Sequence, residues 1–203
     1  MFLTGQNCMA GMRLFVHRKV HDRVIAGIES FAKGLTIGPA ISPDTTIGPL
    51  ISQKQQDRVM GHIEGGIREG AELVTGGHRF GSRGFFVEPT LLAKANPSMR
   101  ITREEIFGPV ITVQAFDDDD VEELCRMVND SIYGLSASVW TTNLSRAHRM
   151  AHAIQAGQVC INCHGAVDAG IPFGGYKQSG WGRECGDDAL ELYTETKAVI
   201  MRL

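Results

Sequence analysis

Long apolar runs and an excess of charge of either sign are both missing from this sequence of 203 residues. No stretch approaches the roughly 18 consecutive apolar residues of a membrane-spanning helix, so no membrane span is predicted. The 20 basic and 23 acidic residues are scattered, which predicts no surface for nucleic acid or for an anionic membrane. The opening MFLTGQNCMAG has neither a basic start nor a long apolar segment, so we expect no secretory signal and a cytoplasmic location.

Cysteine is scarce and irregularly spaced. The five cysteines are odd in number, which predicts reduced thiols rather than a disulfide framework. The stretch QVCINCHGAV places Cys160, Cys163 and His164 at the spacing of covalent haem attachment or of part of a zinc site. No second ligand pair follows at zinc spacing, and Val159 and Ile161 alternate with their neighbours as in a strand. We therefore expect two buried cysteines in a strand, with no haem and no metal.

Repeats and low-complexity linkers are also absent, so we expect a single domain over residues 1–203. Hydrophobic periodicity predicts strands at 12–18, 71–77, 84–92, 108–116, 135–142 and 157–162, and helices at 20–35, 52–70, 121–130 and 144–157. Strands separated by helices of this length predict an α/β fold with a mainly parallel sheet and helices on both faces.

Details of single elements add four expectations. Ser52 is predicted to cap the helix at 52–70, with Val59, Ile63 and Ile67 on one face. The run Asp117–Asp120 is expected to stabilise the start of the next helix through the helix dipole rather than to bind calcium. Residues 196–203, TKAVIMRL, are expected to form a final strand that pairs with another subunit or packs on its own domain.

Three segments combine glycine with reactive side chains: GQNCMAGMR at 5–13, EEIFGPV at 104–110 and IPFGGYKQSGWGRE at 171–184. In the first, glycines on both sides of Cys8 let the backbone approach a ligand closely, which suits a nucleophilic thiol. The spacing alone favours an inert cysteine over a catalytic one. Neither a P-loop nor a G-x-G-x-x-G turn occurs in the sequence, so we expect no cradle for nucleotide phosphates within it.

Together these segments resemble the C-terminal, catalytic part of the aldehyde dehydrogenase superfamily. GQNCMAGMR is similar to the family's cysteine motif, REEIFGPV to its E-x-F-G-P segment, and PFGGYKQSGWGRE to its P-F-G-G-x-K-x-S-G segment. EGAELVTGG at 69–77 and NDSIYGLSASVWT at 129–141 are similar to the family as well. The resemblance covers essentially the whole sequence, with details of the phenylacetaldehyde and betaine-aldehyde branches.

The resemblance implies a chemistry for Cys8. Its thiolate would attack an aldehyde to give a thiohemiacetal, hydride would pass to NAD or NADP, and water would hydrolyse the resulting thioester. The backbone N–H of Cys8 would be one donor of the oxyanion hole. The resemblance also implies that Glu105 holds the nicotinamide ribose and that Phe107 packs beside the nicotinamide. It further implies that Gln55 reaches the adenosine ribose, and that Phe173 and Val167 line the substrate tunnel.

The family's general base, the asparagine of its oxyanion hole and most of its dinucleotide-binding domain precede the cysteine motif. Leu3 and Thr4 also stand where the family usually has asparagine and a polar partner. We therefore expect a fragment, a truncated gene product or half of a split enzyme, inactive alone, whose partner is a missing N-terminal half or another copy. Two alternatives are a non-catalytic remnant that acts in oligomerisation or regulation, and a thiol hydrolase that pairs Cys8 with His164.

Overall fold

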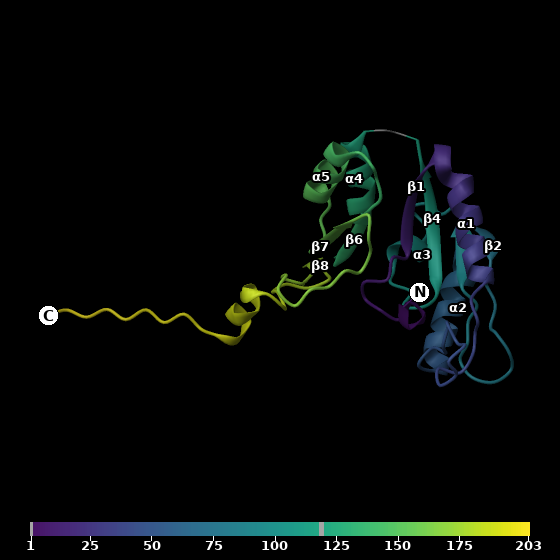
Figure 1. Ribbon diagram of the computed structural model, residues 1–203, viewed down its shortest axis with the longest axis horizontal. Helices are drawn as coiled ribbons and strands as arrows, with labels where there is room; N and C mark the ends of the chain where they lie inside the picture. Colours follow the sequence, from purple (N-terminus) through teal and green to yellow (C-terminus); the bar gives the residue numbers. More distant parts are fainter. Residues whose placement is uncertain (1, 118–119) are drawn as a thin grey trace. The chain divides into compact units, whose positions relative to one another are not determined.

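A computed structural model describes residues 2–117 and 120–203 and divides the chain into two compact units, one up to Asp130 and one from Ser131 (Figure 1). Each unit is described by itself. Two of the four aspartates, Asp118 and Asp119, lie outside the described residues. Asp120 caps the following helix as expected, because its side chain accepts a hydrogen bond from the backbone N–H of Glu122.

The first unit is built on a four-stranded sheet in the order β1-β4-β3-β2. β1 (Arg13–His17) and β3 (Thr90–Ala93) both run parallel to β4 (Val110–Phe116), and β2 (Glu72–Thr75) is antiparallel to β3. Its helices are α1 (His21–Lys33), α2 (Gln53–Arg68), the short α3 (Arg100–Arg103) and α4 (Val121–Asn129). Two short 3₁₀ segments, Phe2–Gly5 and Arg18–Val20, flank β1. The predicted mixed α/β fold with a mainly parallel sheet is confirmed.

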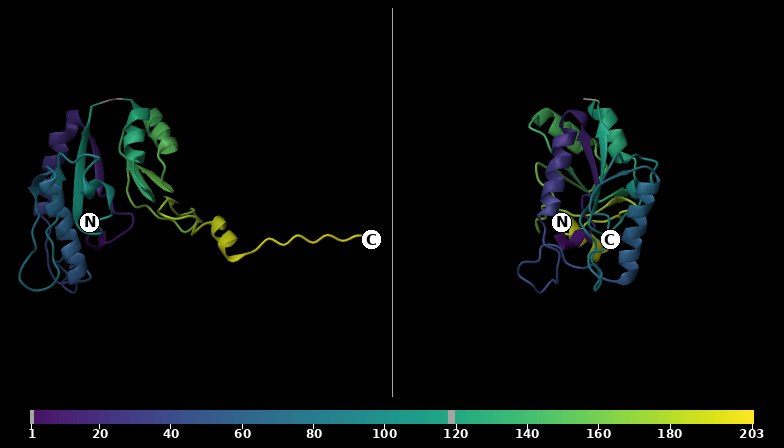
Figure 2. Two further views of the ribbon diagram at one scale, coloured as in Figure 1. Left: turned by 180° about the vertical axis from the view of Figure 1, so that it is seen from behind. Right: turned by 90° about the vertical axis from the view of Figure 1, so that its right-hand side faces the viewer.

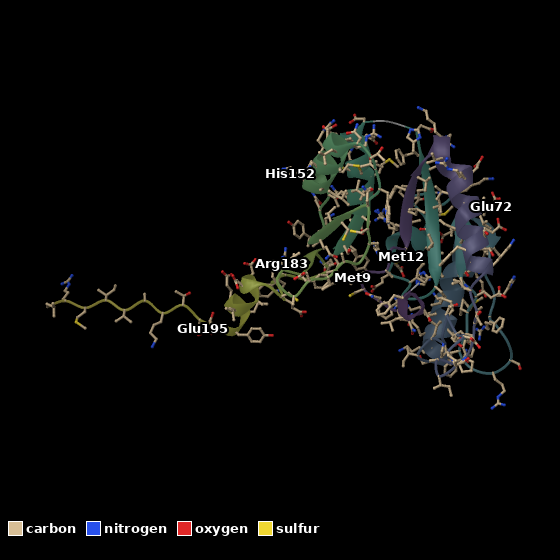
Figure 3. All side chains as sticks on the ribbon, viewed as in Figure 1. Met9, Met12, Glu72, His152, Arg183 and Glu195 are labelled. Atoms are coloured by element: carbon tan, nitrogen blue, oxygen red, sulfur yellow. The ribbon has the colours of Figure 1, made fainter. Side chains whose placement is uncertain are left out.

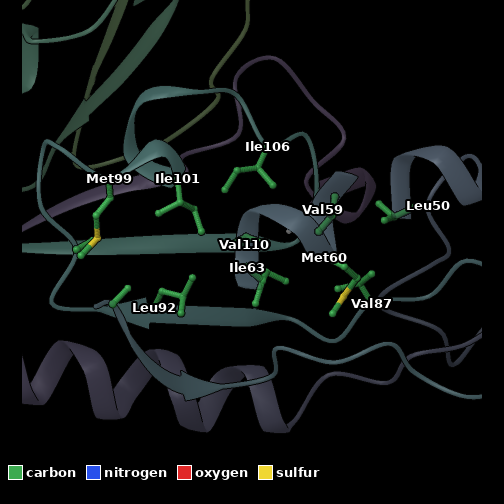
Figure 4. Close-up of a cluster of buried hydrophobic side chains, with 12 residues drawn as sticks. Leu50, Val59, Met60, Ile63, Val87, Leu92, Met99, Ile101, Ile106 and Val110 are labelled. Atoms are coloured by element: carbon green, nitrogen blue, oxygen red, sulfur yellow. The ribbon is translucent and has the colours of Figure 1, made fainter. Parts of the chain in front are cut away.

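Adjacent residues of β3 show how helices cover both faces of this sheet, because successive strand side chains point to opposite sides. Leu91 packs in a cluster with Val16 and Val113, against which side chains of α1 lie. Leu92 belongs to the second cluster, which contains Val59 and Ile63 of α2 (Figure 4). Two views from other directions show the same arrangement of α1 and α2 about the sheet (Figure 2).

The second unit contains short strands and one helix. β6 (Ser136–Val139) and β7 (Gln158–Ile161) pair in parallel, and β5 (Tyr133–Gly134) pairs antiparallel with β8 (Tyr176–Lys177). α5 spans Leu144–Ala153, and a 3₁₀ segment spans Asp187–Tyr193. No helix in the described part of the chain has the length and apolar character needed to cross a bilayer.

Two expectations about single elements are wrong. Residues 84–89 form no strand beyond an isolated bridge between Val87 and Arg79. α5 ends at Ala153, not at 157, because Ile154 turns to an extended conformation and is buried. Residues 196–203 pair with no strand among the described residues, and their pairing with another subunit stays a prediction.

Candidate active site

The loop before Cys8 is pinned by hydrogen bonds to residues 48–51. Thr4 donates its hydroxyl to the carbonyl oxygen of Gly48 over 3.2 Å. The Gln6 side chain accepts from the backbone N–H of Ile51 at 2.9 Å and donates to the carbonyl of Pro49 at 3.4 Å. These bonds span more than forty residues of sequence, so they fix where the chain enters the Cys8 turn.

Cys8 itself lies in an exposed turn. Asn7 organises this turn: its carbonyl accepts from the N–H of Ala10 and its side-chain oxygen accepts from the N–H of Met9, both at 2.9 Å. Figure 3 labels Met9 and Met12 in the segment that continues into β1. Within the described residues, neither the sulfur nor the backbone N–H of Cys8 takes part in a hydrogen bond. Both groups are therefore available to a ligand.

The turn Glu105–Phe107 is held by the first turns of α2. Arg58 donates to the carbonyl of Glu105 at 2.7 Å, and the Gln55 amide donates to the carbonyls of Ile106 and Phe107 at 3.1 and 2.8 Å. Phe107 has φ 58°, a left-handed conformation that a residue other than glycine rarely adopts. With three consecutive carbonyls fixed, the half-buried side chains of Glu105 and Phe107 remain at the surface.

Two glycines join the Cys8 loop to this turn. Gly5 has φ 72°, and a Cβ placed on it would overlap the carbonyl oxygen of Gly108. Gly108 in turn lies so close to α2 that its own Cβ would come within 2.6 Å of the Val59 side chain. Only glycine permits such close approach of two backbones. The Cys8 loop, the Glu105–Phe107 turn and α2 are therefore packed as one assembly.

The charged groups beneath the turn form a structural pair. Arg100 donates to Glu104 at 2.9 Å from two guanidinium nitrogens, and this hydrogen bond lowers the pKa of the Glu104 carboxyl. His62 lies 3.9 Å from Glu104 with a buried ring, and neither ring nitrogen has a hydrogen-bond partner among the described residues. Burial, followed by the nearby Arg100 charge, lowers the pKa of His62.

The second unit holds the other predicted site residues. Phe173 is half-buried and exchanges two backbone hydrogen bonds of 2.7 Å with Glu184, while Val167 is 53% exposed. The His164 ring lies 2.6 Å from the Ser138 hydroxyl. Since the two units are described separately, a shared site of Cys8 with Phe173, Val167 or His164 stays a prediction.

The strand expected in the C-x-x-C-H stretch is confirmed for Cys160, which is buried in β7. It is wrong for Cys163, which is exposed beyond the end of that strand because Asn162, at φ 54°, turns the chain. Across the described residues, no three His, Cys, Asp or Glu side chains gather as a metal site.

Sequence reasoning missed Arg58 and gave Gln55 a ligand contact only. The structure uses both side chains to support the Glu105–Phe107 turn. Their spacing of three residues places them on one side of the helix, and this spacing was the available signal.

Fold and site together define an α/β protein in which an exposed cysteine loop packs against a turn carrying a glutamate and a phenylalanine. The sequence matches the aldehyde dehydrogenase family over residues 1–199. The chain belongs to this family.

Relatives and solved structures agree with this membership. Over its whole length the chain is 47% identical to a Bacillus subtilis protein that bears the name aldehyde dehydrogenase DhaS. Over 98% of its length it is 42% identical to a mitochondrial aldehyde dehydrogenase of Leishmania tarentolae. It covers 41% and 39% of those proteins. The NAD⁺ complex of a Bacillus cereus aldehyde dehydrogenase has a TM-score of 0.94 at 46% identity, covering 98% of this chain and 40% of that one. A Staphylococcus aureus betaine aldehyde dehydrogenase with NAD⁺ has a TM-score of 0.90 at 38% identity, covering 95% and 39%. The chain thus spans about two fifths of the proteins it matches.

Proposed function

We propose that this chain is the cysteine-bearing part of an NAD(P)-dependent aldehyde dehydrogenase that oxidises an aldehyde to a carboxylic acid. The observation that carries the proposal is the contact of Gly5 with Gly108, because it joins the Cys8 loop to the Glu105–Phe107 turn. A nucleophile and a carboxylate–aromatic pair suited to a nicotinamide ribose then belong to one assembly.

Cys8 supplies the covalent step. Its thiolate attacks the carbonyl carbon, a C–S bond forms, and the carbonyl electron pair moves to oxygen as a thiohemiacetal anion. The unpaired backbone N–H of Cys8 donates to that oxygen, and loss of one such donor typically costs about 10²–10³ in rate. NAD(P), when bound beside Glu105 and Phe107, would supply the hydride acceptor for the oxidation. Water then attacks the thioester, and the Cys8 thiolate leaves as the carboxylic acid forms.

The residues of the turn fit a nicotinamide ribose. Glu105 is half-buried, and its carboxylate has no hydrogen bond or ion pair within the described residues, so it can accept from two ribose hydroxyls. Phe107 offers an apolar ring next to it. Gln55 supports the turn, and its contact with the adenosine ribose stays part of the proposal, as does a substrate tunnel lined by Phe173 and Val167.

We further propose that the 203 residues alone oxidise no aldehyde and bind NAD or NADP weakly. The support is that no side chain among the described residues hydrogen-bonds the Cys8 sulfur and could serve there as general base. The base, the second oxyanion donor and the phosphate site would come from a dinucleotide-binding portion. Five free thiols suit a reducing cytoplasm for the assembled enzyme.

The test separates acylation from dehydrogenation. With p-nitrophenyl acetate, the chain should release a burst of nitrophenol equal to the protein concentration, and the Cys8→Ser variant should release none. Deacylation should then stall, and aldehyde plus NAD⁺ should give no NADH. If the Cys8→Ser variant still gives the burst, Cys8 is not the nucleophile. If calorimetry gives a dissociation constant for NAD⁺ in the low micromolar range, the proposal that this chain holds only part of the cofactor site is wrong.

A second candidate function, oligomerisation, is favoured by the C-terminal segment. Val199, Ile200 and Met201 are 79%, 92% and 77% exposed, and such apolar exposure suits burial against another chain. Light scattering of the chain with and without residues 196–203 tests this candidate. If both forms have the same mass, the segment does not drive self-association.

A further inference from the structure

Arg13, the first residue of β1, carries a guanidinium group that the proposed reaction does not use. Its Nη2 donates to the carbonyl oxygen of Val128, near the C-terminal end of α4, at 2.9 Å. The guanidinium carbon lies 5.2 Å from the centre of the Phe15 ring, which is on the same face of the strand. The Nε–H is buried and has no hydrogen-bond partner among the described residues. Because a buried donor of this kind is costly to leave unpaired, it calls for an acceptor.

A cavity of about 10 Å³ lies beside this guanidinium group, within the first unit. Its wall includes Phe15, Met127 and Gln114, and the Gln114 side chain belongs to β4, where it is the strand partner of Phe15. The volume is close to the minimum that one water molecule requires. A single atom therefore fits, whereas a phosphate, a sulfate or a carboxylate group, each with at least three heavy atoms, is too large.

The charges that line the cavity do not cancel. Arg103 donates to the two carboxylate oxygens of Asp130 at 3.0 and 3.3 Å, and this hydrogen bond raises the pKa of Arg103. Asp130 is therefore already paired, and two guanidinium groups with one carboxylate leave one net positive charge. Burial lowers the pKa of Arg13, because its charge is poorly solvated. A charged donor binds an anion more strongly than it binds a neutral acceptor such as water.

We propose that this cavity is a binding site for a single halide ion, which is chloride in ordinary solutions. The Nε–H of Arg13 donates to the ion, while Nη2 of the same group keeps its bond to the Val128 carbonyl. The ion therefore fixes the side chain that joins the start of β1 to the end of α4. It steadies the strand that follows the Cys8 loop. This inference does not rest on the proposed oxidation of an aldehyde.

Hydrogen exchange on the full chain tests the proposal. Both tryptophans and all three tyrosines lie in the second unit, so fluorescence would not report on β1. Chloride replaces gluconate at constant ionic strength, because gluconate is too large for the cavity. An opening that exposes the amides of residues 13–17 also disrupts the cavity, so their exchange should slow as chloride increases. The slowing should follow 1 plus the ratio of the chloride concentration to its dissociation constant.

Two arginine variants separate the site from a general effect of salt. Arg13→Lys keeps the charge but has no N–H at the Nε position, so the slowing by chloride should be lost. Arg183→Lys is the matched control. The Arg183 guanidinium also lies over a ring, 5.4 Å from the centre of Tyr176, and donates to backbone carbonyls, but it belongs to the second unit and does not line the cavity. Arg183→Lys should respond as the parent does, and an equal response in Arg13→Lys overturns the proposal.

Diffraction at long X-ray wavelength identifies chloride directly and needs no variant. In crystals of the chain grown in sodium chloride, an anomalous peak should lie within hydrogen-bond distance of the Arg13 Nε atom. A water molecule at that position, or chloride only at other places, overturns the proposal. If Arg13→Lys does not fold, this measurement decides.

Discussion

The Cys8 loop and the Glu105–Phe107 turn lie against each other, yet the structure holds them in opposite ways. The Cys8 loop is fixed at its entry by Thr4 and Gln6, while the sulfur and backbone N–H of Cys8 have no hydrogen-bond partner among the described residues. The Glu105–Phe107 turn has all three of its carbonyls bound by α2 side chains. The Cys8 loop is thus held by its own side chains, whereas the Glu105–Phe107 turn is held by side chains of another element, α2.

The Glu105–Phe107 turn is therefore built to position its side chains, whereas the Cys8 loop is built to leave its reacting atoms accessible. A turn whose carbonyls are bound can present a carboxylate and a ring without further help, because its backbone cannot relax. Cys8, the nucleophile of the proposed enzyme, is accessible, but no described side chain bonds its sulfur to activate it. The site on this chain therefore supplies geometry, and activation of Cys8 has to come from a further partner in the proposed enzyme.

Gly5→Ala should break the link between the two loops and give the largest effect. The new Cβ overlaps the Gly108 carbonyl, and φ 72° is strained for alanine. Together, strain and overpacking should lower the free energy of unfolding by about 2–6 kcal/mol. Urea unfolding measures the change. Gly27→Ala is the matched control, because nothing lies within 4 Å of its added Cβ on α1; it should be neutral or stabilising by up to about 1 kcal/mol. Equal losses in both variants would contradict the contact.

Gln55→Ala should loosen the turn while leaving the Cys8 loop in place. Two partly buried carbonyls lose their donor, which costs about 1–3 kcal/mol. Hydrogen exchange should accelerate at residues 105–108 and stay unchanged at residues 4–10. Gln53→Ala is the control, since that exposed amide bonds only side chains of its own helix. Faster exchange in both loops would mean that they are supported jointly rather than separately.

The sequence predicted this arrangement unevenly. Periodicity located the parallel strands and α2, since burial on both sheet faces imposes the apolar runs of β3 and β4. Motif similarity picked out Cys8, Glu105 and Phe107. It could not show that Gly5 meets Gly108, because that contact joins backbones about a hundred residues apart and leaves no periodic trace. The exposure of Cys163 was missed for a local reason, the left-handed turn at Asn162.

His62→Leu should reduce the pH dependence of the free energy of unfolding. Burial lowers the pKa of the folded-state imidazole, while Arg58, Arg100, Glu69 and Glu104 act on it electrostatically. The unfolded chain therefore binds a proton first, so stability is full above about pH 6.5 and falls as the pH decreases below it. Urea midpoints between pH 7 and pH 5 should fall for the parent and less for His62→Leu. His78→Gln, at an exposed site, should keep the parent slope. Identical slopes in the parent and His62→Leu would show that His62 does not contribute.

Cys8→Ser should give the smallest change in stability, within about 0.5 kcal/mol, because the exposed sulfur has no partner among the described residues to lose. The same change should remove the principal site of alkylation. With limiting iodoacetamide, Cys8 should react before Cys163, whose raised pKa leaves less thiolate, and before the half-buried Cys185. Peptide mass spectrometry ranks the five sites, and buried Cys125 and Cys160 serve as internal references. Preferential alkylation of Cys163 or Cys185 would mean that the Cys8 thiol is accessible but not especially reactive. The interpretation of this chain as non-catalytic would then be favoured.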